Sequence, residues 1–116
     1  MAARVGSLSR LDRISICPIV RGEVRYGLEL MEHGRRREDL EKAAEEVFLR
    51  FSYEPVSEEV ADCYGRIKRA TERKGTCLDE NDLWIAATAL SSGSILVTSD
   101  TDFERVDGLR TEDWSQ

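Results

Sequence analysis

The 116-residue sequence predicts an α/β fold in which a mostly parallel β-sheet is flanked by helices. Short apolar segments with strand character alternate with longer segments whose apolar residues recur every three or four positions. The composition, 41% hydrophobic and 34% charged, is typical of a globular protein that can bury one modest core. We therefore expect a single domain over residues 1–116.

The first half of the chain predicts a strand followed by two helices. Residues 14–17, ISIC, have the pattern of a short buried strand. Pro18 suits the first turn of a helix, where its missing N–H is tolerated, and this helix should run to about His33. Gly34 should end it, followed by a charged turn, GRRRED, and by a second amphipathic helix from Asp39. Apolar stripes on the two helices include Val24, Leu28, Leu40, Val47 and Phe48.

A third helix should follow a short extended segment, SYEPVS, in which Pro55 makes a helix unfavourable. Ser57 is placed to cap this helix through its side chain, and the helix should continue to Lys74. Val60, Tyr64 and Ile67 would share one of its faces. Gly75 should end it.

A fourth helix is predicted from the motif DENDLWIAATAL, which begins at Asp79, to about Ser92. Gly93 would close the helix in the left-handed conformation that glycine favours. Residues 94–99, SILVTS, predict a buried strand. A short helical turn over residues 102–106 should lead to a last strand from Leu109 to about Trp114.

Charge and cysteine content exclude some classes of protein. A net charge of −6 argues against non-specific coating of nucleic acid, since such binding depends on excess Lys and Arg. No segment has the length of apolar sequence that spans a membrane, and we expect no secretory signal. Cys17, Cys63 and Cys77 form no metal-binding pair, so we expect reduced thiols in a cytoplasmic protein. A disulfide between Cys63 and Cys77 is the alternative.

Four acidic residues follow or adjoin apolar elements in a pattern that indicates a shared site. Glu23 lies early in the first helix, Asp82 in the first turn of the fourth, and Asp100 and Asp102 directly after the strand SILVTS. In a parallel sheet, the carboxyl ends of strands and the first turns of the following helices meet at one edge, where ligands bind. The pattern therefore predicts one cleft lined by these carboxylates.

Carboxylates that close together repel one another unless a cation neutralises them. Oxygen ligands without His or Cys favour Mg²⁺ or Mn²⁺ over zinc. Such an ion activates water and stabilises charge on phosphoryl oxygens, which points to phosphodiester hydrolysis.

Each acid also has a structural interpretation. Glu23 could be a solvated helix residue, Asp82 could complement the helix dipole, and Asp102 could cap the short helical turn. Asp100 is harder to explain in this way, because it immediately follows a buried strand. Arg35–Arg37 should lie in a solvated turn, with contact to RNA phosphates as the alternative. We expect Asp79 and Glu80 to cap a helix or face the solvent, and Trp84 and Trp114 to be packing residues.

Three separated motifs resemble one known family. NDLWIAATAL, then ILVTSDTDF with a terminal LRTEDW, is similar to the C-terminal half of PIN-domain proteins, and more narrowly of VapC toxins from VapBC toxin–antitoxin systems. ISICPIVRGEVRYGLEL resembles the segment that carries the second acid of that family. The resemblance spans about residues 14–114 and implies a three-layer PIN-like fold.

The resemblance also implies an activity and partners. It implies an endoribonuclease dependent on Mg²⁺ or Mn²⁺ that cuts tRNA or ribosomal RNA, is neutralised by a VapB-type antitoxin and forms a homodimer. Glu23 matches the second acid of the family, Asp82 the third and Asp100 the fourth, while Asp102 matches a frequent additional acid. These four residues would hold the metal ion and orient the attacking water.

One motif of the family is absent: an apolar strand that ends in an acid, expected before Ile14. We therefore expect an N-terminally truncated PIN-like domain that lacks the first metal ligand. A catalytically inactive remnant that binds the antitoxin is the alternative function. A purely structural domain whose acids serve only as caps is a third.

Overall fold

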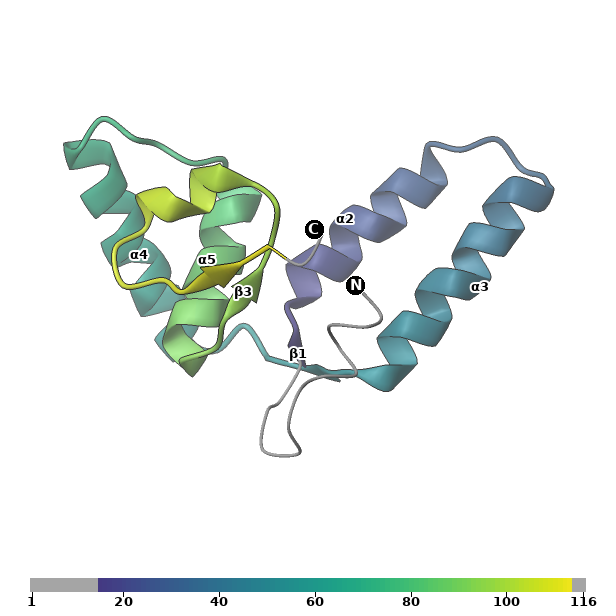
Figure 1. The fold of residues 1–116 in the computed structure, drawn as a ribbon, viewed down its shortest axis with the longest axis horizontal. Coiled ribbons are helices and arrows are strands. Elements are labelled where there is room, and N and C mark those ends of the chain that lie inside the picture. The colour runs from purple at the N-terminus through teal and green to yellow at the C-terminus, as the bar shows by residue number, and fades with distance from the viewer. Residues whose placement is uncertain (1–14, 114–116) are drawn as a thin grey trace. The chain divides into compact units, whose positions relative to one another are not determined.

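The computed structural model of the protein describes residues 15–113. The described residues form two compact units, residues 15–55 and residues 56–113 (Figure 1). The predictions for Ile14 and Trp114, and for a missing N-terminal strand, concern positions outside this part of the chain. The single domain over residues 1–116 stays a prediction.

The first unit is a helical hairpin joined at its base by a pair of parallel strands. Its elements are β1 (Ser15–Ile16), α2 (Pro18–Glu29), α3 (Arg35–Arg50) and β2 (Ser52–Tyr53). β1 and β2 pair in parallel, with Ser15 opposite Ser52 and Ile16 opposite Tyr53. The predicted strand and the helix start at Pro18 are confirmed.

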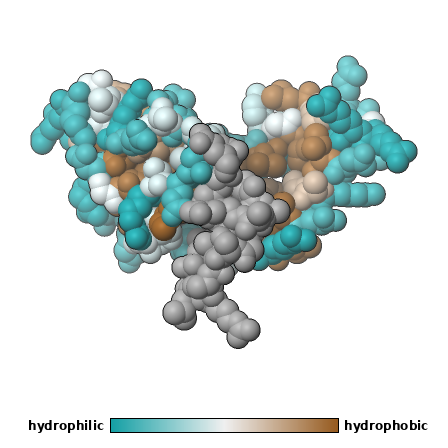
Figure 2. Space-filling model, in the orientation of Figure 1, coloured by the Kyte–Doolittle hydropathy of each residue, from teal (hydrophilic) through white to brown (hydrophobic). Residues whose placement is uncertain are grey.

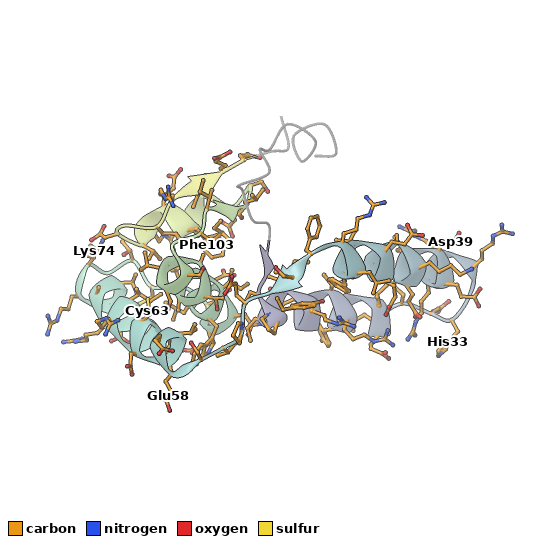
Figure 3. The ribbon with its side chains drawn as sticks, turned by 90° about the horizontal axis from the view of Figure 1, so that it is seen from below. His33, Asp39, Glu58, Cys63, Lys74 and Phe103 are labelled. Carbon is orange, nitrogen blue, oxygen red and sulfur yellow. The ribbon has the colours of Figure 1, made fainter. Side chains whose placement is uncertain are left out.

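The turn of this hairpin differs from the prediction. α2 ends at Glu29 rather than near His33, and α3 begins at Arg35 rather than at Asp39. Gly34 therefore precedes α3 instead of ending α2. His33, which is labelled in Figure 3, lies in the connection between the two helices, at the end of the hairpin.

Arg37 explains why the charged segment is helical. Its side chain is only 8% exposed, so the prediction of a solvated turn is wrong at this residue. The guanidinium donates to Glu41 at 2.7 Å and to the carbonyl oxygen of Met31 at 3.1 Å, and it lies 3.3 Å from Glu29. A buried charge is tolerated only when it is paired in this way, and here it ties both helices to the turn.

The second unit carries two packed helices, a parallel strand pair and a short 3₁₀ helix. Its elements are α4 (Glu58–Arg73), α5 (Glu80–Ser92), β3 (Leu96–Val97), η1 (Thr101–Arg105) and β4 (Thr111–Glu112). β3 and β4 pair in parallel, with Leu96 opposite Thr111 and Val97 opposite Glu112. The described strands thus form two parallel pairs, one in each unit.

The boundaries of α4 and α5 agree with the capping signals in the sequence. The hydroxyl of Ser57 accepts a hydrogen bond from the backbone N–H of Val60 at 3.4 Å. Gly75, after α4, and Gly93, at the end of α5, both have a φ of 69°, which a residue with a side chain rarely adopts. These predicted helix ends are confirmed.

The core of the second unit lies where α4 packs on α5. Leu83 is 2% exposed, and Ala86 and Ala87 have no exposed surface. Small side chains at these two positions let the neighbouring elements approach α5 closely. Phe103 of η1 adds an aromatic ring, 5% exposed, to the same unit. Other buried residues of this unit are Val60, Cys63, Ile67, Thr71, Ile85, Thr88, Ala89 and Val106.

The strand predicted over residues 94–99 is shorter and more exposed than expected. Only Leu96 and Val97 have strand geometry, and Ile95 and Val97 are 43% and 38% exposed. An apolar run predicts burial only if another element covers it, and β3 pairs with β4 alone among the described strands. The prediction of a buried strand is therefore wrong for these two side chains.

The three cysteines are free, so the alternative of a Cys63–Cys77 disulfide is not realised. Cys17 and Cys63 are buried, as expected for small apolar groups, whereas Cys77 is exposed. Figure 3 labels Cys63 on α4, where burial raises the pKa of its thiol. Among the described residues, no helix is long and apolar enough to cross a membrane.

Candidate functional site

Asp82 occupies the first turn of α5, as the sequence predicts. The turn begins at Asp79, whose side chain makes no capping hydrogen bond to the helix. The N–H groups of a first turn favour nearby negative charge, and Asp82 is half-buried there. This helix position is therefore compatible with both a ligand role and a dipole-complementing role for Asp82.

Asp100 follows β3 and begins η1. Its carboxylate accepts a hydrogen bond from the backbone N–H of Asp102 at 2.9 Å, while its own N–H donates to the hydroxyl of Thr98 at 3.0 Å. Asp100, rather than Asp102, is thus the capping residue of η1. The buried ring of Phe103 anchors the same short helix to the core.

Asp102 is half-buried and pairs with Arg105, one turn further along η1, at 3.1 Å. The guanidinium of Arg105 also donates to the carbonyl oxygen of Cys77 at 3.0 Å. Arg105 therefore ties η1 to the segment that precedes α5.

Glu23 lies on α2 in the first unit and is exposed. The other three candidate acids belong to the second unit, where a hydrogen bond joins Asp100 to the backbone of Asp102. Within residues 15–113, no three side chains of His, Cys, Asp or Glu gather closely enough to hold a metal ion. The prediction of a four-carboxylate cleft stays a prediction.

A cluster that sequence reasoning missed joins α4 to the first turn of α5. Lys68 donates to Glu80 at 2.6 Å and to the hydroxyl of Tyr64 at 3.2 Å, and that hydroxyl also donates to Glu80. The ring of Trp84 stacks on Tyr64, with centroids 4.0 Å apart and planes 4° from parallel. The hydrogen bonds from Lys68 and Tyr64 lower the pKa of Glu80 below its usual value.

The expected packing role of Trp84 is confirmed by this stack. Glu80 faces the solvent, the second of its two expected roles, since its side chain is 57% exposed, and it also pairs with Lys68. The sequence held one signal of the cluster: Tyr64 and Lys68 are one helical turn apart, as are Glu80 and Trp84. That spacing does not reveal which face of α4 packs against which face of α5.

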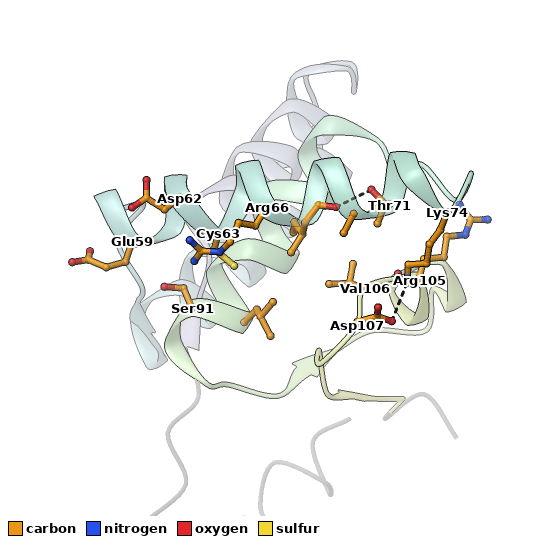
Figure 4. Close-up of a pocket in the computed structure, with 13 residues that line it drawn as sticks. Glu59, Asp62, Cys63, Arg66, Thr71, Lys74, Ser91, Arg105, Val106 and Asp107 are labelled. Atoms are coloured by element: carbon orange, nitrogen blue, oxygen red, sulfur yellow. Dashed lines mark hydrogen bonds and ion pairs between the residues drawn. The ribbon is translucent and has the colours of Figure 1, made fainter.

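A half-open cavity of about 520 Å³ lies in the second unit, between α4, the end of α5 and the segment around η1 (Figure 4). Ile67, Leu90 and Val106 contribute apolar surface, and Arg66 and Lys74 contribute cationic groups. Lys74 pairs with Asp107 across one end at 2.9 Å. None of the four candidate acids lines this cavity, so it is separate from the predicted site.

The family model of the PIN domain matches residues 2–109, so this chain belongs to the PIN-domain family. The PIN-like fold predicted from the sequence is thereby confirmed.

Individual relatives narrow this assignment. The chain is 34% identical over 103 residues to Ribonuclease VapC2 of Haemophilus influenzae, covering 88% of this chain and 76% of that protein. A VapBC-1 structure from nontypeable Haemophilus influenzae aligns with a TM-score of 0.87 and 28% identity, covering 99% of this chain and 84% of the other. A shorter match, 50% identical over 52 residues, is to the tRNA(fMet)-specific endonuclease VapC of Shigella flexneri, over 44% of this chain and 39% of that protein. The VapC ribonucleases are therefore the branch of the PIN family that this chain resembles.

Proposed function

We propose that the chain is an endoribonuclease of the VapC type that hydrolyses RNA phosphodiester bonds. Membership of the PIN family carries the proposal, together with acids at three of the positions where the family resemblance expects them. One relative is named as a tRNA-specific endonuclease, which supports tRNA as the substrate class, with ribosomal RNA as the second choice.

The residues proposed for this activity are Glu23, Asp82, Asp100 and Asp102, and the proposed cofactor is Mg²⁺ or Mn²⁺. The donor chemistry fits such an ion, because all four ligands are carboxylates and hard cations prefer oxygen. The ion would supply an activated water and charge stabilisation at phosphorus. Among the described residues, no three such side chains lie close enough together to bind the ion.

The surroundings of two of these acids, Asp82 and Asp100, suit a role in holding the substrate or the water. Asp82 lies in a first helical turn, a position at which negative charge is favourable. The backbone of Asp102 holds the carboxylate of Asp100 in a fixed orientation through a hydrogen bond. A fixed orientation of the Asp100 carboxylate would favour catalysis, because a reacting group must be held close to its productive geometry.

The proposed partners are a VapB-type antitoxin and a second copy of the chain, in the cytoplasm. The structural relative in the VapBC-1 structure supports an antitoxin partner. The hairpin of α2 and α3 exposes several apolar side chains, shown among hydrophilic ones in Figure 2. Leu30 is 69% exposed, Leu49 83% and Tyr26 66%, and exposed apolar surface of this kind is characteristic of protein interfaces. We assign this surface of the hairpin to the antitoxin.

RNA cleavage by the purified 116-residue chain tests the proposal. The assay compares Mn²⁺ or Mg²⁺ with EDTA, and the unaltered chain with Asp82→Asn, which keeps the size of the side chain and removes its charge. Cleavage that requires metal and is lost in the variant would support the enzyme. Antitoxin binding without any cleavage would refute it and favour the alternative, an inactive PIN remnant that acts as an interaction module.

A further inference from the structure

Four side chains connect α4 to the first turn of α5, and we call them the α4–α5 brace: Tyr64, Lys68, Glu80 and Trp84. Glu80, the first residue of α5, receives hydrogen bonds from both Lys68 and Tyr64. Trp84, one turn later, stacks flat on the ring of Tyr64. The brace therefore holds α5 at two successive turns of its N-terminal end.

The first turn of α5 needs such support. Asp79 stands at the N-cap position, but its side chain accepts no hydrogen bond from the backbone N–H groups of the turn. An uncapped helix end frays more readily, because its first N–H groups have no partner within the helix. Glu80 instead anchors the turn to the neighbouring helix.

Helix geometry places Asp82 away from the brace but within the turn that it holds. Residues of an α-helix are separated by about 100° around the axis, so Glu80 and Trp84 share a face, while Asp82 lies about 200° from Glu80. The brace can thus fix the position of Asp82 without occupying the side on which Asp82 stands.

The ion pair of the α4–α5 brace contributes little to the stability of the fold. The side chains of Lys68 and Glu80 are 39% and 57% exposed, and exposed ion pairs contribute little to the free energy of folding. Its distinctive property is geometric: it joins two helices at the residue that begins α5. We infer that Lys68, Glu80 and Tyr64 are positioning residues that orient Asp82 for RNA hydrolysis, an inference that rests on the proposed function.

The first experiment measures amide hydrogen exchange by NMR in the full chain and needs no RNA. The reporter is the amide of Leu83, which donates to the carbonyl oxygen of Asp79 at 2.9 Å and closes the first turn of α5. Glu80→Gln and Lys68→Met should each speed its exchange about fivefold. The control is Glu72→Gln, which removes another exposed ion pair, with Arg69, that lies wholly within α4. Unchanged exchange at Leu83 in both brace variants would overturn the inference.

The second experiment measures kcat and KM for RNA cleavage in the same variants. A displaced catalytic group lowers kcat, so Glu80→Gln and Lys68→Met should each reduce it about tenfold with KM unchanged. The two substitutions remove charges of opposite sign. A purely electrostatic influence on Asp82 would therefore move the rate in opposite directions, whereas lost positioning lowers it in both. The double variant should lose no more activity than either single variant, because both remove the same contact.

The outcomes separate this inference from the proposed function. Cleavage that is lost in Asp82→Asn but unchanged in both brace variants would refute the positioning role alone. Rate changes of opposite sign would refute it as well. No cleavage by the unaltered chain would refute the proposed function, and the positioning role with it.

Discussion

Shortening the buried side chain of Leu83 to alanine should strongly destabilise the second unit. Leu83 is 2% exposed, the lowest exposure of any large side chain among the described residues. Leu→Ala at such a site loses the transfer free energy of the removed carbons and leaves a cavity, which together cost about 3 kcal/mol. For a chain of this size, that loss should lower the melting temperature by about 12 °C.

The matched control is the same substitution at Leu49, which is 83% exposed on α3. Leu49→Ala should change the free energy of unfolding by no more than about 0.5 kcal/mol. Thermal and urea unfolding followed by circular dichroism measure both variants. If Leu83→Ala were as stable as Leu49→Ala, the packing of α5 described above would be wrong.

Three further predictions concern helix ends and pH. Ser57→Ala removes the hydroxyl that caps α4 and should cost about 1 kcal/mol in urea unfolding, while Ser57→Asp should retain most of the stability. Gly93→Ala forces a side chain into a left-handed conformation, φ 69°, and should cost about 1 kcal/mol in the same assay; an unchanged midpoint would contradict this backbone geometry. The hydrogen bond from Arg25, with the charges of Arg25 and Arg37, lowers the pKa of Glu29 below its ordinary value of 4.5. This contribution to stability is present above pH 4.5 and is lost as the pH falls through the lowered value, so melting temperatures from pH 6 to pH 3 should fall less steeply in Glu29→Gln.

The sequence predicts elements well where the signal is local. Ser57, Gly75 and Gly93 mark helix ends through their own hydrogen bonds or backbone angles, and the structure confirms each of them. The prediction for the hairpin turn is wrong because its conformation depends on Arg37, whose partners include Glu29 at the end of α2 and Met31 in the connection between the helices. A charged run has the same pattern whether it is solvated or buried and paired, so only tertiary structure separates these cases.

The candidate site shows the same limit. Position along the chain suffices to predict that Asp82 lies in the first turn of a helix and that Asp100 follows a strand. It does not predict that Glu80, two residues before Asp82, is held by α4, because the contact depends on the rotation of one helix against the other. Nor could it decide which of Asp100 and Asp102 caps η1.

Asp100 shows that capping and ligand roles need not exclude one another. A carboxylate has about four lone-pair positions, and the hydrogen bond from the N–H of Asp102 uses one of them. The cap fixes the orientation of the group, which is what a ligand to a metal ion requires. Asp100→Asn should separate the two roles, since asparagine caps helices as well as aspartate but carries no charge.

We therefore expect Asp100→Asn to unfold within about 0.5 kcal/mol of the unaltered chain while losing RNA cleavage. Asp100→Ala should lose both, with a cost of about 1 kcal/mol for the missing cap. Urea unfolding and the RNA cleavage assay, run on the same samples, provide the two measurements. An Asn variant that still cleaves RNA would show that Asp100 serves only as a cap, and would remove it from the proposed ligands.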